Sequence, residues 1–434
     1  MFHLFRSDES AHIPGYKEQT RNLPVCSYDP EFVYIPCVDN HGNPLINALP
    51  ISSSVKKGTL LGLRAPDDFP IYSSVSGKIE GRQKRVRSSG RIRDCFVIRN
   101  DHKGEWDTLT PLKPANEVSR EEIINAIKKS GVIGFGGAGF PTYRKFNSGK
   151  ECDVLILNAI ECEPFLTTDY VYGAKECEYA FLAIPYLLKA SGAKKVVFCT
   201  KKDKPALIDA CGKWKAKYPS LPVELVLAKD AYPRGYERNL VTLVTGKEYA
   251  HIPIEAQAIV DNIFTFISLG RYFTEGKSAD LRCITVSGEV SKPRNILTPY
   301  GVYALDLLQR AGYKNDSSLK ILNGGPRNGN VLDDEKFVLL QQADGITVRK
   351  KSSYRAEPCW HCGNCAEACP RDLQPVQIQM AYKANDLQRR IELNADRCVG
   401  CGLCSYSCPS RIEVSQHVRA AKALVIKARK EAKK

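Results

Sequence analysis

The chain has no apolar run long enough to cross a bilayer, although it is 434 residues long. Its most apolar stretches are FLAIPYLL (181–188) and IVDNIFTFISLG (259–270), whereas a membrane helix needs about 20 apolar residues. The first residues, MFHLFRSDESAHIPG, carry acidic side chains where a signal peptide has an apolar segment. We therefore expect no transmembrane segment, and a protein that is cytoplasmic or peripherally attached to a membrane.

Acidic residues are also in short supply: 48 Asp and Glu face 63 Lys and Arg, a formal charge of +15. Such a charge suits nucleic acid, an anionic membrane or an acidic protein partner. No nucleic-acid-binding motif accompanies it, so we expect no nucleic acid partner. Seven basic residues and one acidic residue lie between Arg419 and Lys434. They follow a helical pattern with apolar Val414, Val418, Ala421 and Val425, which indicates a solvated helix face or, alternatively, a docking helix.

Disulfide bonds are not expected despite 17 cysteines, because the chain is long, lacks an export signal and places eight cysteines in one spaced cluster. A reducing compartment and metal ligation fit better. The other nine are scattered singly, and we expect ordinary buried cysteines at most of these positions: Cys26, Cys37, Cys95, Cys152, Cys162, Cys177, Cys199, Cys211 and Cys283.

The clustered cysteines form the pattern C-x2-C-x2-C-x3-C-P twice, which is the spacing of bacterial two-cluster ferredoxins. In that pattern three close thiolates bind one 4Fe-4S cubane and the fourth binds the other. One set is therefore Cys359, Cys362, Cys365 and Cys408, and the second is Cys398, Cys401, Cys404 and Cys369. Structural zinc takes its four thiolates as two separated pairs, so zinc fits less well. Two adjacent cubanes predict a one-electron wire.

Four regions follow from the pattern of expected strands and helices, giving a multidomain α/β and α+β protein. Residues 1–115 alternate short β-rich runs with turns and pair VKKGTLLG with YSSVSGKIEG, which looks like the barrel-sandwich hybrid of lipoyl and biotinyl carriers. Lys78 lacks the Met-Lys-Met context of a carrier lysine, so this domain is interpreted as scaffold. Residues 116–276 alternate helices and strands, which predicts a parallel sheet. Residues 277–352 form a small α+β module, and residues 353–434 contain the cysteines.

Glycines 134, 136, 137 and 139 match G-x-G-x-x-G, but a helix (EEIINAIKKSG) precedes them where a Rossmann fold has a strand. The loop can still bring backbone close to a phosphate or flavin, or be a tight turn without a ligand. The strand DVLILNA then delivers Asn158, Glu161 and Glu163 at its carboxyl end, where ligands bind in open α/β sheets. Carboxylates there suit ribityl hydroxyls or a nicotinamide amide; a surface loop is the alternative.

Taken together, GVIGFGGAGFPTYRK and LNAIECEPFLTTD resemble the flavin-binding core shared by the NADH-dehydrogenase subunit of respiratory complex I and the RnfC subunit of the Rnf complex. The ECEP form is that of Rnf. Further matching segments span nearly the whole chain: HIPGYKEQT, YSSVSGKI, YPRGYERNLVTLVTG, IVDNIFT, ITVSGEVSKP, LNGGPRNG and CSYSCPSRIEVSQHVR. The module at 277–352 resembles the soluble-ligand-binding (SLBB) β-grasp domain of that family.

The resemblance implies FMN, NADH and specific residues around them. It places FMN against Gly134, Gly136 and Gly137, with Lys145 near its phosphate or ring. It implies contact with NADH for Phe140 and Glu163, and Glu163 is the candidate catalytic residue. The remaining pocket residues that it implies are Asn158, Glu161, Gly235, Glu237, Asn262 and Thr265.

Four positions depart from the expected pattern. Ser10 and Ala11 stand where two glycines are usual before the His-Pro segment. Tyr236 replaces the second glycine expected in YPxGGE, and its side chain would crowd or stack on the nucleotide. Cys162 stands where complex I has serine, and we expect it to line the pocket rather than to react.

The function implied is hydride transfer from NADH to FMN, followed by single-electron release to the two 4Fe-4S clusters. The resemblance places the chain as the NADH-facing peripheral subunit of an Rnf-type membrane complex on the cytoplasmic face, with other subunits as partners and ferredoxin reached indirectly. One alternative is a soluble NADH-dependent donor to a dedicated reductase of the proline or cobalamin type. Another is a flavin-free electron relay.

Overall fold

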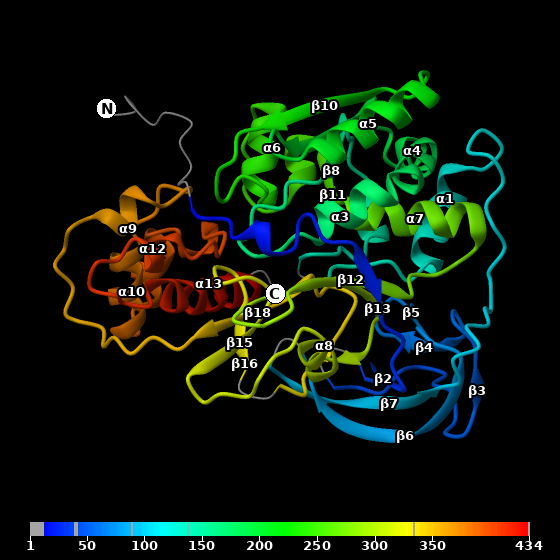
Figure 1. The fold of residues 1–434 in the computed structure, drawn as a ribbon. Helices are drawn as coiled ribbons and strands as arrows, with labels where there is room; N and C mark the ends of the chain where they lie inside the picture. Colours follow the sequence, from blue (N-terminus) through cyan, green and yellow to red (C-terminus); the bar gives the residue numbers. More distant parts are fainter. Residues whose placement is uncertain (1–12, 39–41, 88–89, 138, 333–334, 433–434) are drawn as a thin grey trace.

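The computed structural model describes residues 13–38, 42–87, 90–137, 139–332 and 335–432, and it confirms the expected multidomain α/β and α+β fold (Figure 1). Ser10 and Ala11 lie outside the described residues. The N-terminal region forms a four-stranded sheet in the order β2-β7-β6-β3 beside a two-stranded hairpin. Alternate residues such as Val33, Ile35 and Phe96 fill its core. The sheet strands are β2 (Phe32–Pro36), β3 (Ser54–Val55), β6 (Gly77–Val86) and β7 (Ile92–Asn100), and the hairpin strands are β4 (Leu60–Arg64) and β5 (Phe69–Tyr72).

The α/β layer contains a sheet in the order β10-β9-β8-β11 whose neighbouring strands all pair in parallel, as expected. Asn158 and Asn262 are register partners at the carboxyl ends of β8 and β11, so two candidate site residues begin adjacent loops. The strands are β8 (Val154–Asn158), β9 (Lys195–Lys201), β10 (Val223–Ala228) and β11 (Ala258–Asn262). The helices are α1 (Arg120–Lys129), α2 (Tyr143–Phe146), α3 (Thr168–Lys175), α4 (Cys177–Ser191), α5 (Pro205–Lys217), α6 (Glu237–Thr245), η2 (Pro253–Ala256) and α7 (Ile263–Glu275).

The third unit is a six-stranded sheet in the order β1-β13-β12-β18-β15-β16, with one helix and a short strand pair beside it. Its edge strand β1 comes from the N-terminal region and pairs in parallel with β13, so the sheet includes residues well outside 277–352. The strands are β1 (Val25–Ser27), β12 (Leu281–Gly288), β13 (Arg294–Pro299), β15 (Leu319–Asn323), β16 (Asn330–Leu332) and β18 (Gly345–Lys350). The remaining elements are η1 (Lys17–Gln19), β14 (Val302–Tyr303), α8 (Ala304–Arg310) and β17 (Val338–Leu339).

The C-terminal domain is a separate lobe reached through residues 351–358, which form neither helix nor strand (Figure 1). Its long helix α13 buries Val414, Val418, Ala421 and Val425 in the core of the lobe. The apolar face of this basic helix therefore packs within the chain. The helices are α9 (Asn364–Glu367), α10 (Pro375–Lys383), α11 (Leu387–Glu392), η3 (Ala395–Arg397), α12 (Leu403–Tyr406) and α13 (Val414–Glu431). Within the described ranges, no helix combines the length and apolarity needed to span a membrane.

Helix α7, which begins at the site, packs closely against α4 through Gly270. A Cβ atom at Gly270 would lie 1.9 Å from the carbonyl oxygen of Tyr179 in α4. A Cβ atom at Gly212, in the exposed face of α5, would meet nothing within 4 Å. The two helical glycines thus differ in whether a neighbouring backbone occupies the space.

We predict opposite effects for Gly270→Ala and Gly212→Ala. Alanine favours a helix over glycine by about 1 kcal/mol, so Gly212→Ala should raise the melting temperature slightly. Gly270→Ala should lower it by several degrees, because α4 and α7 must separate. Thermal unfolding of the full chain measures both, and a stabilised Gly270→Ala variant would contradict this packing.

Candidate functional site

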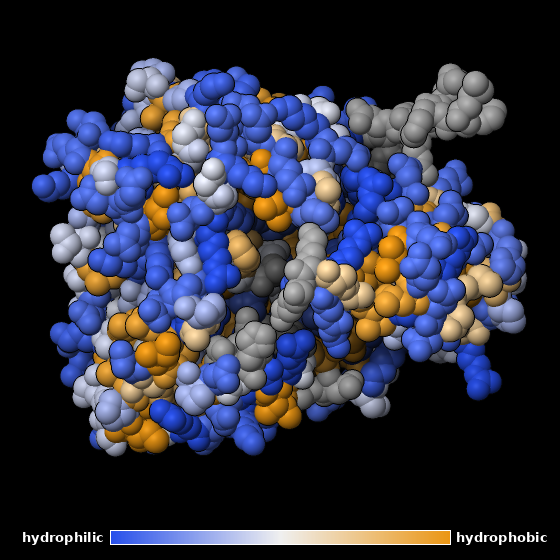
Figure 2. Space-filling model, turned by 180° about the vertical axis from the view of Figure 1, so that it is seen from behind, coloured by the Kyte–Doolittle hydropathy of each residue, from blue (hydrophilic) through white to orange (hydrophobic). Residues whose placement is uncertain are grey.

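A cavity of about 720 Å³ lies where the α/β layer, the six-stranded unit and the C-terminal lobe meet. Figure 2 shows the molecule from behind, with a hollow near its centre beside this lobe. Eleven of the twelve cofactor-binding residues expected from the sequence line the cavity, and Thr265 is the exception. Asp169, Tyr236 and Asp261 also line the cavity, close in sequence to expected residues. Further lining residues come from distant segments: Asn328, Asp344, Val399, Gly400 and Arg419.

The glycine loop turns its backbone toward the cavity. Gly134 N–H donates to the Phe140 carbonyl at 2.8 Å and closes the loop. Phe135 N–H donates to Thr265 Oγ1 at 3.3 Å, so Thr265 holds the loop from behind. Gly136 has a φ of +67°, which favours glycine, and a Cβ atom at Gly137 would meet nothing within 4 Å. The loop therefore leaves open space beside exposed backbone.

Asn158 and Asn262 shape the cavity through bonds to the protein itself. Asn158 donates to the Gly235 carbonyl at 2.9 Å and accepts from Ile160 N–H at 3.0 Å. Asn262 caps α7 by accepting from Phe264 N–H at 2.7 Å and donates to Asp169 at 2.6 Å. In both side chains the amide nitrogen donates and the amide oxygen accepts a hydrogen bond within the protein. These bonds hold the loops that surround the cavity in place.

Gly235 is required by close packing, because a Cβ atom there would lie 2.1 Å from the Ile160 carbonyl oxygen. The neighbouring Glu237 lines the cavity and accepts a hydrogen bond from the Tyr249 hydroxyl at 3.0 Å.

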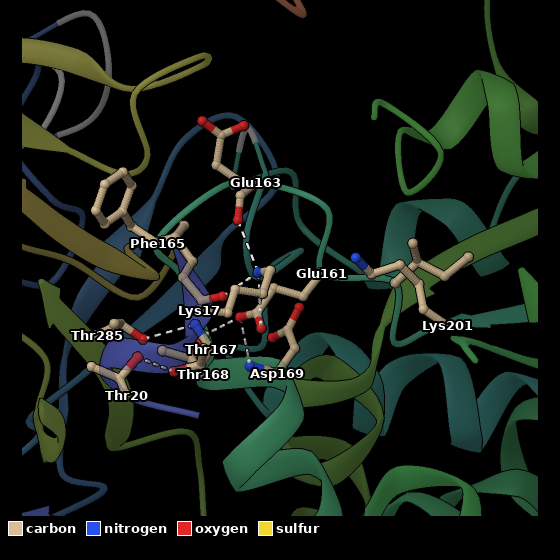
Figure 3. Close-up of polar contacts among 12 residues, drawn as sticks. Lys17, Thr20, Glu161, Glu163, Phe165, Thr167, Thr168, Asp169, Lys201 and Thr285 are labelled. Carbon is tan, nitrogen blue, oxygen red and sulfur yellow. Dashed lines mark hydrogen bonds and ion pairs between the residues drawn. The ribbon is translucent and has the colours of Figure 1, made fainter. Parts of the chain in front are cut away.

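Glu161 is buried and bonded from two directions (Figure 3). Its Oε1 accepts from Asp169 N–H at 3.0 Å, at the start of α3, and its Oε2 lies 3.7 Å from Lys17 Nζ. Lys17 is itself buried and donates to the carbonyl oxygens of Glu163, at 2.9 Å, and Leu166. Burial lowers the pKa of Lys17, and the charge of Glu161 opposes this shift. Sequence reasoning missed Lys17, although it stands within the family segment HIPGYKEQT.

Glu163 is buried as well, and the six-stranded unit supplies its partners. Its Oε1 accepts from the backbone N–H groups of Arg327, at 2.7 Å, and Asn328, at 3.2 Å. Its Oε2 has no hydrogen-bond partner among the described residues. Burial raises the pKa of this carboxyl group, and the two backbone hydrogen bonds oppose the shift. One oxygen is therefore held by a distant loop, while the other remains for a ligand.

A buried arginine lies beneath the same cavity. The Arg282 guanidinium lies 4.9 Å from the Phe135 ring centre and 4.2 Å from that of Phe264. Its charge lowers the pKa of the cavity residue Asp344, but burial is the larger effect and raises that pKa to about 7. Burial and the charge of Glu161 likewise raise the pKa of Asp169. Neither aspartate was singled out in the sequence, because neither follows the end of a strand of the parallel sheet.

Lys145 and Phe140 lie at the more open side. Lys145 Nζ donates to the Val260 carbonyl at 2.6 Å and to Asp261 Oδ1 at 2.7 Å. Asp261 Oδ2 is buried without a hydrogen-bond partner in the described part of the chain. Phe140 is 47% exposed, with the Arg144 guanidinium 5.8 Å from its ring centre. The cavity thus combines several carboxylates with basic residues from α2.

Tyr236 and Cys162 connect the cavity to the C-terminal lobe. The Tyr236 hydroxyl lies 2.9 Å from that of Tyr232, which donates to the Cys401 carbonyl at 2.7 Å. Tyr236 lines the cavity, as its position in the sequence suggested, and shares an apolar cluster with Cys162. Burial raises the pKa of Cys162 to about 12, which keeps its thiol protonated and agrees with a lining role.

The structure places Cys369 beside Cys398, Cys401 and Cys404, close enough for electrostatic interaction. Cys359 and Cys365, of the other set, also interact. The sets differ in exposure: Cys401 and Cys404 are buried, whereas Cys362 is exposed. No three His, Cys, Asp or Glu residues among those described lie at the spacing of ligands to a single ion. Ligands of a cubane surround four iron atoms and so stand further apart.

The residues present fit both expected cofactors. The cavity volume is within the roughly 300–1,000 Å³ of small-molecule sites. One carboxylate oxygen each of Glu161 and Asp261 accepts no hydrogen bond from the described residues and can accept one from a ribityl hydroxyl. The glycine loop leaves room for a ring or phosphate. The eight thiols have the two-cluster spacing, and six of them interact electrostatically with another cysteine of the same set.

Family models match the N-terminal domain, the α/β layer and the cysteine-rich domain. The RnfC barrel sandwich hybrid domain matches residues 5–103, the Nuo51 FMN-binding domain matches 127–271 and a 4Fe-4S dicluster domain matches 358–412. An NAD+-reducing NiFe-hydrogenase has a similar fold, with a TM-score of 0.50 and 20% identity over 72% of this chain and 64% of its own.

Curated relatives cover most of the chain. The C subunit of the Na(+)-translocating ferredoxin:NAD(+) oxidoreductase complex of Acetobacterium woodii is 30% identical over 88% of each chain. The C subunit of the proton-translocating ferredoxin:NAD(+) oxidoreductase complex of Clostridium ljungdahlii is 29% identical over 85% of this chain and 82% of its own. The C subunit of an ion-translocating oxidoreductase complex from Vibrio cholerae is 30% identical over 75% of this chain, which spans 43% of that relative.

The fold and the site define an electron-transfer protein with an FMN-binding domain and a 4Fe-4S dicluster domain. The chain belongs to the RnfC family of Rnf complex subunits, as the sequence motifs indicated.

We predict that Asp344→Asn removes part of the pH dependence of stability. The folded-state pKa of about 7 lies above the ordinary value of 3.8, so the folded protein binds the proton more tightly. The resulting stabilisation is complete below about pH 3.8 and is lost as the pH rises through 7. The melting temperature of Asp344→Asn minus that of the wild type should therefore increase by about 2 °C or more when the pH is raised from 5 to 8.

The measurement uses the flavin-free full chain, with Asp209→Asn on the exposed side of α5 as the matched control. A difference between Asp344→Asn and the wild type that does not change with pH would contradict the prediction.

Proposed function

We propose that this chain transfers electrons between NADH and one-electron carriers, as the NADH-facing peripheral subunit of an Rnf-type ferredoxin:NAD oxidoreductase complex on the cytoplasmic side of the membrane. When bound, FMN supplies a carrier that accepts two electrons from a nicotinamide and releases them singly. The names of the curated relatives support the complex and its ferredoxin and NAD chemistry.

One observation carries the proposal: residues of the second cysteine motif form part of the cavity wall. Val399 and Gly400 stand between the ligand candidates Cys398 and Cys401, and both line the cavity with the glycine loop. The Tyr232 hydroxyl joins the α/β layer to the Cys401 carbonyl. A flavin in this cavity would consequently have a cluster-binding loop as a neighbour.

The two cysteine sets differ in exposure, and this difference suggests which cluster lies nearer the flavin site. The set with buried Cys401 and Cys404 belongs to the motif whose Val399 and Gly400 line the cavity, while exposed Cys362 belongs to the other set. We propose that the cluster of the inner set (Cys369, Cys398, Cys401 and Cys404) exchanges electrons with the flavin. The cluster of the outer set (Cys359, Cys362, Cys365 and Cys408) would face the partner that exchanges single electrons.

The nucleotide side of the site is proposed from Glu163 and Phe140. Glu163 Oε2, which lacks a hydrogen-bond partner within the described residues, suits the carboxamide of a nicotinamide. Half-exposed Phe140 offers a ring face at the mouth, and Arg144 lies over it. Lys145 and Arg144 would hold phosphate oxygens. Tyr236 narrows the cavity near Cys162 and would limit how the nucleotide enters.

Purification of the full chain separates this proposal from a flavin-free relay. We expect about one FMN and about eight iron atoms per chain, together with NADH-dependent dye reduction. Clusters without flavin would contradict the enzyme and support the relay.

We predict that Cys401→Ala lowers the iron content from about eight to about four atoms per chain, because it removes one ligand of the inner set. Cys211→Ala, which alters a buried cysteine of α5 outside both motifs, serves as the control and should keep all the iron. Iron analysis with visible absorption measures both variants. Unchanged iron in Cys401→Ala would contradict the assignment of this set.

We predict that Glu163→Gln lowers NADH turnover by about tenfold or more, while both clusters and the flavin remain bound. The substitution keeps the shape of the side chain but removes its charge. Steady-state kinetics with iron and flavin analysis provides the test. Equal losses of iron and activity would show that Glu163 acts through folding.

A further inference from the structure

The β15–β16 loop (residues 324–329) touches both halves of the proposed electron path. It belongs to the six-stranded unit, and its sequence, GGPRNG, contains three glycines. On one side its backbone donates to Glu163, and on the other it packs against Gly402 of the second cysteine motif and accepts a hydrogen bond from Arg419 of α13.

Contact on the Glu163 side is too close for any residue but glycine. A Cβ atom at Gly325 would lie 2.1 Å from Glu163 Cγ. The backbone N–H groups of Arg327 and Asn328 both donate to Glu163 Oε1, and Asn328 also lines the cavity. Since Glu163 is buried, these bonds replace the water that the carboxylate loses.

Contact on the cysteine side involves the same residue, Arg327. Its carbonyl oxygen accepts from Arg419 Nη2 at 3.0 Å, and the same Arg419 nitrogen donates to the Gly400 carbonyl. A Cβ atom at Gly402, where φ is +75°, would lie 2.7 Å from the Arg327 carbonyl oxygen. The Arg327 guanidinium lies 3.8 Å from the ring centre of Tyr406 in α12.

The loop itself is anchored in its own sheet. Gly324 N–H donates to the Gly345 carbonyl at 2.7 Å, and Thr347 Oγ1 donates to the Gly324 carbonyl at 2.8 Å. Both partners belong to the central strand β18. Because these two bonds hold the base of the loop in the sheet, we expect a displacement at one side of the loop to be passed to the other.

We propose that the β15–β16 loop is a clamp that fixes the second cysteine motif and Glu163 relative to each other, with Arg327 as its positioning residue. Its benefit for electron transfer rests on the proposed function, but the clamp itself does not. The linker at 351–358 has no helix or strand, so the position of the lobe depends on such contacts. The α/β layer also contacts the lobe, through the hydrogen bond from Tyr232 to the Cys401 carbonyl and through ion pairs of Glu248 with Arg371 and Arg397.

Hydrogen exchange of the full chain tests the clamp without relying on activity. Gly325→Ala disturbs the loop at Glu163, and we expect amide exchange at residues 399–403 to become at least about tenfold faster. Exchange in β12 should stay at the wild-type rate. Gly81→Ala is the control, because a Cβ atom at Gly81 would meet nothing within 4 Å.

Arg327→Ala is the second variant and removes the side-chain contact with Tyr406. It should also speed exchange at residues 399–403. If Gly325→Ala unfolds the sheet, amide exchange in β12 will be faster than in the wild type, and Arg327→Ala then provides the test of the clamp. Wild-type exchange at 399–403 in Arg327→Ala, or in a folded Gly325→Ala, would overturn the clamp.

A kinetic readout separates failure of the clamp from failure of the proposed function. With NADH, flavin reduction in Arg327→Ala should keep its wild-type rate, while cluster reduction becomes slower. A chain that binds no flavin would contradict the proposed function and leave the exchange result unaffected. Slower flavin reduction together with unchanged exchange would show that Arg327 acts on the nucleotide and would overturn the clamp.

Discussion

The arrangement of the molecule depends on two buried carboxylates, Glu161 and Glu163, at the end of the central strand β8. A buried carboxylate is costly unless hydrogen bonds or an opposite charge replace its water. Lys17 from the N-terminal segment and the first turn of α3 surround Glu161. The β15–β16 loop supplies two N–H groups to Glu163. Three segments far apart in the sequence are thereby brought to one side of the cavity.

The β15–β16 loop that binds Glu163 also connects the α/β layer to the C-terminal lobe. Residues that hold Glu163 also contact the second cysteine motif, through Arg419 and Gly402. A cavity at this junction has the α/β layer on one side and a cluster-binding loop on the other. The chemistry proposed for the chain requires such proximity, since electrons must leave a two-electron carrier one at a time without reaching solvent.

The sequence predicted the elements with clear local patterns. The alternating segments of 116–276 form the parallel sheet, the helix expected at EEIINAIKKSG forms as α1, and the apolar stripe of α13 is buried. The family matches confirm the fold, the cofactors and the assignment to the RnfC family. Individual ligand roles and the domain boundaries stay predictions, although eleven expected residues line one cavity.

Other residues could not be found from local pattern because their roles depend on distant contacts. Lys17 and Asp344 come from segments far apart in the sequence, and Arg282 is buried by aromatic rings of another unit. Asn158 illustrates the reverse case: its position suggested a ligand contact, yet its amide bonds Gly235 and Ile160. Spacing locates such residues at a site, but only the fold shows which atoms remain for a ligand.

Flash reduction of flavin bound to the purified chain, with iron-sulfur absorbance followed in time, tests the central claim most directly. Because the cysteine motif forms part of the cavity wall, electrons should reach a cluster within one molecule. The rate of cluster reduction should then be independent of protein concentration. A rate proportional to protein concentration, or clusters that stay oxidised beside reduced flavin, would contradict a shared site.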